Sequence, residues 1–197
     1  MFGDFKLILN VGLIFGEVMN NLIVWLFFLA TLINLARKTS PKKLYDKDGL
    51  FPRELLNLSG VMFLSYLLSL PIYDFSGLKF YGFFISQQLV YLVYDLLTIF
   101  VVCNVLNVLS NKAKVVRFYL VLGMTINGLL FFVVHICIIN AEKGTPFLPL
   151  WMVDFYFYTI NISDAVMVIS LVLCRDFLLL YKLKNMFIKR SSMLCSS

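Results

Sequence analysis

The chain has 197 residues, 61% of them hydrophobic, and its mean hydropathy is +0.90. Soluble domains are about 45–50% apolar, so this composition excludes an ordinary soluble protein and predicts helices in a lipid bilayer. The formal net charge is +6, but the basic residues cluster between apolar runs, as membrane topology requires, so direct nucleic-acid binding is not expected.

The first apolar run covers residues 7–36, which is longer than the roughly 20 residues that cross a bilayer. We predict one long helix whose span is approximately 11–36; in the alternative, an N-terminal interfacial helix leaves four spans. Small residues allow close helix packing and polar ones hydrogen-bond between helices. The small residues of this run are Gly12 and Gly16, and its polar residues are Glu17, Asn20 and Asn21.

The loop predicted at 37–53 contains turn signals at Pro41 and Pro52 and six basic residues. The basic residues are Arg37, Lys38, Lys42, Lys43, Lys47 and Arg53. The favoured interpretation is a topology signal that lies on anionic headgroups. The alternative is a docking site for a cytosolic protein partner.

Three further runs predict spans at approximately 55–72, 81–109 and 118–139. Helical spacing places the polar residues of the middle run, Gln88, Asp95 and Thr98, on one stripe. Before the last of these runs, Lys112, Lys114 and Arg117 predict a second basic turn, and the run itself contains Gly123, Asn127 and His135. For His135 we expect a packing role rather than a catalytic one.

The longest apolar run of the C-terminal half lies within 147–184 and predicts a fifth span at 151–174. Helical spacing places its main polar residues on one face, which are Asp154, Tyr158, Asn161, Asp164 and Arg175. A carboxylate in hydrocarbon costs about 2.5–3.5 kcal/mol even on the lenient scale, so this face requires protein or water as its neighbour. Past Arg175 the helix is expected to continue along or beyond the inner surface, and residues 191–197 to be disordered.

The fold class predicted is all-α: a polytopic membrane helix bundle of five transmembrane helices that forms a single domain over 1–190. Most basic residues fall in the loops 37–53, 112–117 and 182–190. The positive-inside rule then places the N-terminus outside and the C-terminus in the cytoplasm, in a multi-pass protein of the inner membrane. Several copies would cover the polar faces better than one, so a homo-oligomer is expected.

The motifs of several membrane enzymes are missing from the sequence. It has one histidine and contains neither HExxH, GxSxG, GxGxxG nor a Walker A motif. The four cysteines form no CxxC pair. We therefore expect a protein that is not an enzyme and uses no metal or cofactor.

The acids within spans, Glu17, Asp95 and Asp164, carry the functional signal, since ionisable residues inside a membrane are costly. They ring an outward-facing vestibule, or only hold helices together. The favoured hypothesis is an oligomeric channel-like or sensor subunit coupled to a cytosolic partner; bacterial anti-phage defence operons encode multi-span subunits of similar size. The alternatives are a small secondary transporter of protons, cations or a small solute, and an immunity-type protein that binds another membrane protein.

Overall fold

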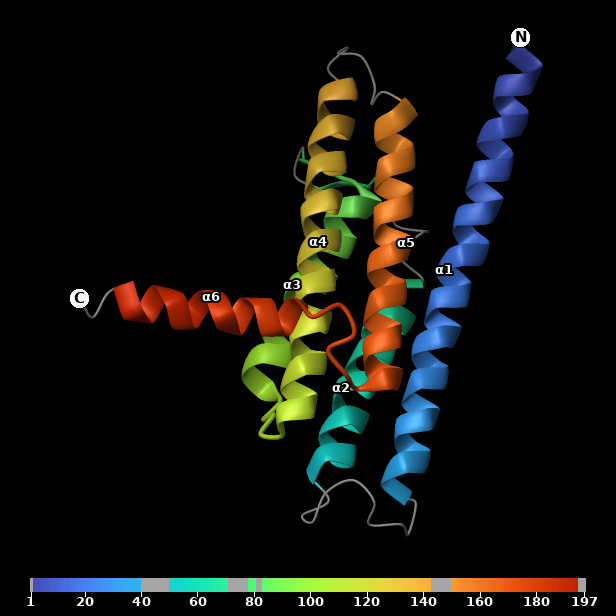
Figure 1. Ribbon diagram of the computed structural model, residues 1–197. Coiled ribbons are helices and arrows are strands. Elements are labelled where there is room, and N and C mark those ends of the chain that lie inside the picture. Colours follow the sequence, from blue (N-terminus) through green and yellow to red (C-terminus); the bar gives the residue numbers. More distant parts are fainter. Residues whose placement is uncertain (1, 40–49, 71–77, 81–82, 143–149, 195–197) are drawn as a thin grey trace.

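Five long helices lie side by side, and a sixth leaves them at a large angle (Figure 1). The computed structural model describes residues 2–39, 50–70, 78–80, 83–142 and 150–194. The long helices are α1 (Phe2–Thr39), α2 (Leu50–Ser69), α3 (Gln87–Phe100), α4 (Asn111–Glu142) and α5 (Leu150–Leu173), and the sixth is α6 (Leu180–Leu194). A short π-helix, η2 (Val101–Val105), follows α3 directly. The all-helical fold class is confirmed, with one small addition: strands β1 (Leu78–Phe80) and β2 (Phe83–Ile85) form an antiparallel ribbon ahead of α3.

Four helices are long and apolar enough to cross a membrane, as expected for a membrane protein. These segments are Asn21–Thr39, Gln87–Val105, Asn111–Asn140 and Trp151–Leu173. The second predicted span forms α2, which packs against α1, α3 and α4 but does not belong to this set of four. Five spans therefore stay a prediction. Residues 2–16 continue the same helix as the first span, so they do not form a separate interfacial helix.

Helices that follow one another in the sequence run antiparallel in the bundle, whereas α1 and α5 run in the same direction (Figure 1). Helix α1 packs chiefly against α2 and also against α5, while α4 packs against both α3 and α5. The buried core between them contains large apolar side chains from several helices, among them Phe27, Leu55, Met62, Leu120 and Met167. The outward faces are apolar as well, and Trp25 and Leu129 are examples of exposed large side chains. A helix that is apolar on all sides is typical of a membrane span.

Several predicted boundaries differ from the structure. The loop predicted at 37–53 is shorter, because α1 extends to Thr39 and α2 begins at Leu50. The span predicted at 81–109 begins as strand β2 and becomes helical only at Gln87, where the Ser86 hydroxyl accepts a hydrogen bond from the Leu89 N–H as a helix N-cap. Its helical part ends at Val105. The basic turn predicted at 112–117 is the start of α4, because Ser110 caps that helix: its hydroxyl accepts from the Ala113 N–H.

The C-terminal helix is also divided differently from the prediction. Helix α5 ends at Leu173, and the chain turns through two non-glycine residues in the left-handed region, Cys174 with φ 55° and Leu179 with φ 57°. The exposed Arg175 lies in this turn, so it does not extend a polar face of α5. Residues 191–194, which were predicted to be disordered, belong to α6.

Arg37 joins the C-terminal ends of α1 and α5. Its guanidinium donates to the Val172 carbonyl at 2.7 Å and to the Asn34 side-chain oxygen at 3.0 Å, and it lies 3.2 Å from the Cys174 sulfur. The Asn34 amide donates in turn to the Leu171 carbonyl at 3.4 Å. These carbonyls lack partners within α5, and a cation near a helix C-terminus is favourable. Arg37 thus faces protein, whereas it had been grouped with the loop residues that face headgroups or a partner.

Arg37→Ala is expected to lower the free energy of unfolding by about 1.5–3 kcal/mol, because charge-assisted hydrogen bonds to helix-terminal carbonyls are lost. Lys38→Ala is the matched control, since Lys38 is exposed at the next position, and its effect should stay within about 0.5 kcal/mol. Unfolding in detergent measured by circular dichroism compares the two variants. Equal effects would contradict the role given to Arg37.

Candidate functional site

A polar cluster lies inside the bundle, near the middle of its membrane-spanning helices. Asp95 of α3 is 8% exposed, Asp164 of α5 is 5% exposed, and Asn127 of α4 is 2% exposed. By helical rise, Asp164 lies about 14 Å from Leu173 and about 20 Å from Trp151, the ends of its candidate span. Neither carboxyl points into lipid, so both have neighbours from other helices.

Two donors hold the Asp164 carboxyl. The Tyr66 hydroxyl of α2 donates to its Oδ1 at 2.5 Å, and the Asn127 amide donates to the same oxygen at 2.7 Å. Tyr66 itself is fixed by its ring, which packs 4.4 Å from the Phe27 ring of α1. Hydrogen bonds from neutral donors stabilise a carboxylate, so Asp164 is provided with what its charged form needs.

Asp95 has a different environment, although it interacts electrostatically with Asp164. Its Oδ2 is buried and accepts no hydrogen bond, and the same is true of the Asn127 Oδ1. Next to it along α3, the Thr98 hydroxyl is 2.6 Å from the Ser65 hydroxyl of α2 and donates to the Tyr94 carbonyl. The cluster therefore contains more buried acceptor oxygens than donors. A proton or a cation would satisfy them, and an unsatisfied buried oxygen costs about 1–3 kcal/mol.

Apolar and aromatic side chains close the two sides of the cluster differently. Met62, Met124 and Met167, which we call the methionine layer, are fully buried one helical turn from Tyr66, Asn127 and Asp164, on the side where α1 and α5 end. On the opposite side lie Tyr156 and Tyr91, whose rings both pack against Phe131.

The tyrosine side of the cluster leads toward the start of α3. Tyr156 interacts electrostatically with both carboxyls and with Tyr91. The Gln87 amide in the first turn of α3 donates to the Tyr91 hydroxyl at 2.6 Å. Hydroxyl and amide groups thus lie between the cluster and that end of the bundle, whereas on the other side the three methionines present apolar thioether side chains to the cluster.

The structure brings together part of the predicted polar stripe. Asp95 and Thr98 lie in the cluster, Gln88 is half-buried about two turns from Asp95 on the same helix, and Asp164 joins them from α5. The single face predicted for α5 is divided. Asp154 and Tyr158 are exposed, and the half-buried Asn161 donates to the Phe157 carbonyl of its own helix.

The buried face of α5 also contains two serines that do not belong to the predicted polar face. Ser163 and Ser170 are buried there together with Asp164. Ser163 donates to the Gly123 carbonyl of α4 at 3.1 Å. Because α5 packs against both α4 and α1, a wider arc of its surface is covered than one stripe, and that arc excludes Asp154.

Several predicted residues of the N-terminal third have no described side chain. Gly12, Gly16, Glu17 and Asn20 lie in α1, and only their backbone is described. Lys42, Lys43 and Lys47 lie outside the described residues, so their contact with headgroups or a partner stays a prediction. Asn21, Lys38 and Arg53 are exposed.

Sequence reasoning missed Tyr66 and Gln87 and left Asn127 without a role. Tyr66 is one aromatic residue in an apolar run, so nothing in its own segment distinguishes it from a packing residue. Asn127 carried a signal, since an amide within a span needs a partner. The predicted packing role of His135 agrees with its surroundings: it is buried, and its Nδ1 lies 2.7 Å from the Ser86 hydroxyl.

Fold and cluster together define an all-helical membrane protein that carries a carboxyl pair within its bundle. Among the described residues, no three His, Cys, Asp or Glu side chains gather as a group that could hold a metal ion. No known protein family, no characterised protein and no solved structure matches this chain. The function must therefore be argued from the cluster itself.

Tyr66→Phe is expected to lower the free energy of unfolding by about 1–3 kcal/mol, because it leaves a buried carboxyl with one donor fewer. Tyr158→Phe removes the same hydroxyl from an exposed side chain of α5 and should change stability by less than about 0.5 kcal/mol. Urea or SDS titration in mild detergent measures both. A Tyr66 variant as stable as the Tyr158 variant would refute the hydrogen bond.

Proposed function

We propose that this chain is a small secondary transporter that binds a proton or a monovalent cation at Asp95, inside the bundle, and moves it across the membrane. The observation that carries the proposal is the buried Asp95 Oδ2, which accepts no hydrogen bond and belongs to a carboxyl that interacts electrostatically with Asp164. Intramembrane carboxyls with this surplus of acceptor oxygens are typical of proton relays and cation pathways.

The two carboxyls have complementary roles in this mechanism. Asp164 keeps two donors, which favour its charged form, and in this mechanism it supplies the negative charge that stays in the site. Asp95 is the group that binds and releases the proton or cation. When no proton or cation is bound to Asp95, its charge and that of Asp164 repel each other in a medium of low dielectric, which destabilises the helix packing around the cluster. Binding of the proton or cation to Asp95 removes this repulsion and favours the closed arrangement.

The side chains that close the two sides of the cluster suggest how the site opens to one side of the membrane and then to the other. Tyr156, Tyr91 and Gln87 give the site a polar connection toward the start of α3. The methionine layer blocks the other side, and methionine side chains repack easily because they are unbranched and flexible. Movement of that layer would expose the site to the end of the bundle where Arg37, Lys38 and Lys112 lie, which the positive-inside rule assigns to the cytoplasm.

Reconstitution into liposomes tests this proposal. Vesicles that contain the purified protein and a dye sensitive to protons, sodium or potassium are given a gradient of the matching ion in turn. A flux above that of empty liposomes, saturable in one cation, supports transport. Absence of flux in all three gradients, together with no cation-dependent change in tyrosine fluorescence in detergent, would refute it.

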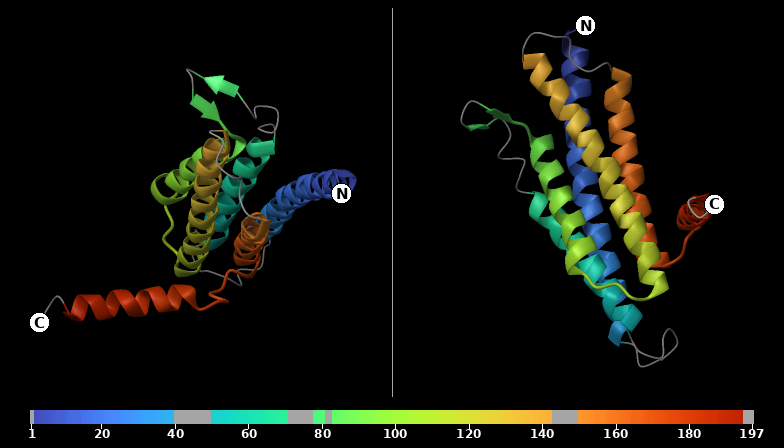
Figure 2. Two further views of the ribbon diagram at one scale, coloured as in Figure 1. Left: turned by 90° about the horizontal axis from the view of Figure 1, so that it is seen from above. Right: turned by 90° about the vertical axis from the view of Figure 1, so that its left-hand side faces the viewer.

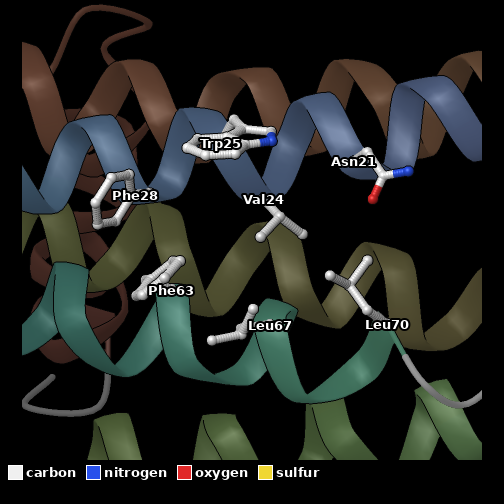
Figure 3. A pocket seen from close by; sticks show the side chains of 7 residues that line it. All are labelled: Asn21, Val24, Trp25, Phe28, Phe63, Leu67 and Leu70. Carbon is white, nitrogen blue, oxygen red and sulfur yellow. The ribbon is translucent and has the colours of Figure 1, made fainter.

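A second candidate is the homo-oligomeric channel or sensor subunit, and a groove on the outside of α1 and α2 favours it. The groove has a volume of about 250 Å³ (Figure 3). Its lining is Asn21, Val24, Trp25, Phe28, Phe63, Leu67 and Leu70. Asn21 is exposed among apolar neighbours, and amide side chains in lipid hydrogen-bond across helix interfaces. A second copy of this chain is the occupant that would satisfy Asn21.

Self-association distinguishes this candidate from the first. Single-molecule photobleaching in lipid nanodiscs counts the copies for the wild type and for Asn21→Leu. Oligomers that the substitution dissolves support the interface. Monomers for both would remove the oligomeric candidate and leave the transporter untouched, because the carboxyl cluster lies within one chain.

A further inference from the structure

We infer that α6 is an interfacial helix that lies on the surface of an anionic membrane, with its basic residues on phospholipid headgroups. This inference is independent of transport, because α6 is remote from the carboxyl cluster. It rests on three features: how α6 is fixed at its start, which residues its free part exposes, and the depth at which it leaves the bundle.

The turn before α6 is held in place by hydrogen bonds and ring stacking. The Tyr119 hydroxyl of α4 donates to the Asp176 Oδ1 at 2.5 Å and accepts from the Leu178 N–H at 3.2 Å. The Asp176 carboxyl also accepts from the backbone N–H groups of Tyr181 and Lys182, at the first turn of α6. The Phe177 ring stacks on the Tyr119 ring, with centroids 5.2 Å apart.

These contacts fix the direction of α6, although the turn before it contains a residue in an unfavourable backbone conformation. Leu179, directly before α6, has φ 57°, a conformation that costs a branched residue about 1–2 kcal/mol. A left-handed leucine persists only where neighbouring contacts hold it. Helix α6 therefore leaves the bundle in a fixed direction: it crosses the direction of the long helices in Figure 1, extends away from them in the left view of Figure 2, and is seen nearly end-on in the right view.

Beyond its first turn, α6 exposes both apolar and basic side chains. All residues from Lys182 to Ile188 are exposed. The large apolar ones are Leu183, Met186, Phe187 and Ile188, and Phe187 is 69% exposed. The helix sequence contains four basic residues and no acid. A basic helix of mixed apolar and polar residues is typical of a segment that lies in the membrane interface.

The depth of α6 agrees with such a position. Its first turn contacts α4 at Phe118, whose ring is 5.6 Å from the Tyr181 ring and 5.2 Å from the Lys184 ammonium. The helical rise from Phe118 to Asn140, the far end of the candidate span, is about 33 Å, close to the roughly 30 Å of a hydrocarbon core. Helix α6 thus leaves the bundle near the Asn111 boundary of that candidate span, about 10 Å of helical rise inside it.

The positive charge of α6 and of the surface beside it indicates which class of phospholipid the helix binds. The same boundary carries Lys112, Lys114 and Arg117 in the first turns of α4, so α6 adds its own basic residues to a surface that is already positive. Each lysine or arginine near an anionic surface contributes a factor of about five in affinity. The structure therefore assigns α6 to anionic phospholipids, in preference to zwitterionic ones.

A tryptophan reporter on α6 tests this in the full-length chain. Phe187→Trp is placed in a Trp25→Phe/Trp151→Phe background, which removes both native tryptophans. The protein is reconstituted into nanodiscs of phosphatidylcholine, with or without phosphatidylglycerol, that carry brominated acyl chains. Blue-shifted emission and bromine quenching that increase at least about twofold with the anionic lipid are expected.

The decisive comparison is between two double charge reversals. Lys182→Glu/Lys184→Glu should remove the dependence on anionic lipid. Lys38→Glu/Arg53→Glu makes the same change in net charge at exposed sites away from α6 and should retain it. Thermal unfolding verifies that both variants fold. Unquenched emission from water in both lipids would overturn the inference and leave α6 free for a protein partner, and equal quenching in both lipids would overturn the requirement for anionic charge.

Discussion

Asp95→Asn is expected to reduce cation uptake into liposomes about 100-fold or more, with little loss of stability. An opposite charge about 4 Å away is worth about 4 kcal/mol at the effective dielectric of a protein interior, or about three orders of magnitude in affinity. The amide keeps the shape of the side chain and removes its charge. It also adds a donor to a cluster that contains a surplus of acceptors, so folding should not suffer.

Asp154→Asn is the matched control for this variant. It makes the same change at an exposed aspartate in the first turns of α5, away from the cluster, and should leave uptake unchanged. Asp164→Asn is expected to impair both properties, because an amide nitrogen would face the donors from Tyr66 and Asn127. Wild-type uptake by the Asp95 variant would refute the transporter, whatever the stability measurements give.

Gly123→Ala is expected to destabilise the bundle by about 1–3 kcal/mol. A Cβ built at Gly123 would lie 2.6 Å from the Met167 Cγ, 2.7 Å from its Sδ and 3.1 Å from the Ser163 hydroxyl. Helices α4 and α5 would have to separate, or Met167 would have to leave the methionine layer. Overpacking of this kind exceeds the gain of up to about 1 kcal/mol that alanine has over glycine in a helix.

Gly60→Ala provides the control for the same substitution without the crowding. No atom lies within 4 Å of a Cβ at this position in α2. The variant should be neutral or more stable by about 0.5–1 kcal/mol, since alanine favours helix. SDS titration in detergent micelles ranks the two. A Gly123 variant that matches the Gly60 variant would contradict the close packing of α4 on α5.

The helical class and most of the span positions followed from the sequence, because an apolar run of about 20 residues in a chain of this composition has no other stable form. The ends of the helices were predicted less accurately than their positions. The α5 helix was predicted to pass Arg175 since the apolar run continues there, but the chain turns at Cys174 and is held by Tyr119, a residue far away in the sequence. Local pattern contains no information about such a contact.

The cluster was predictable only in part for a similar reason. Asp95 and Asp164 were chosen because a carboxyl in hydrocarbon requires a partner, and that argument needs no structure. Their partners, Tyr66 and Asn127, come from helices whose rotation about their own axes is set by packing. Helical spacing placed Asp164 on a face with Asp154, yet the helices that surround α5 cover Asp164 and leave Asp154 exposed.

The sequence by itself determined that this is a membrane helix bundle with acids inside its spans, because hydropathy and the cost of burying charge are properties of each segment alone. The tertiary structure decided which acids meet, which of their oxygens lack a donor, and where the last helix leaves the bundle. Those properties depend on how five helices rotate and pack against one another, and that arrangement minimises a free energy to which all the segments contribute together.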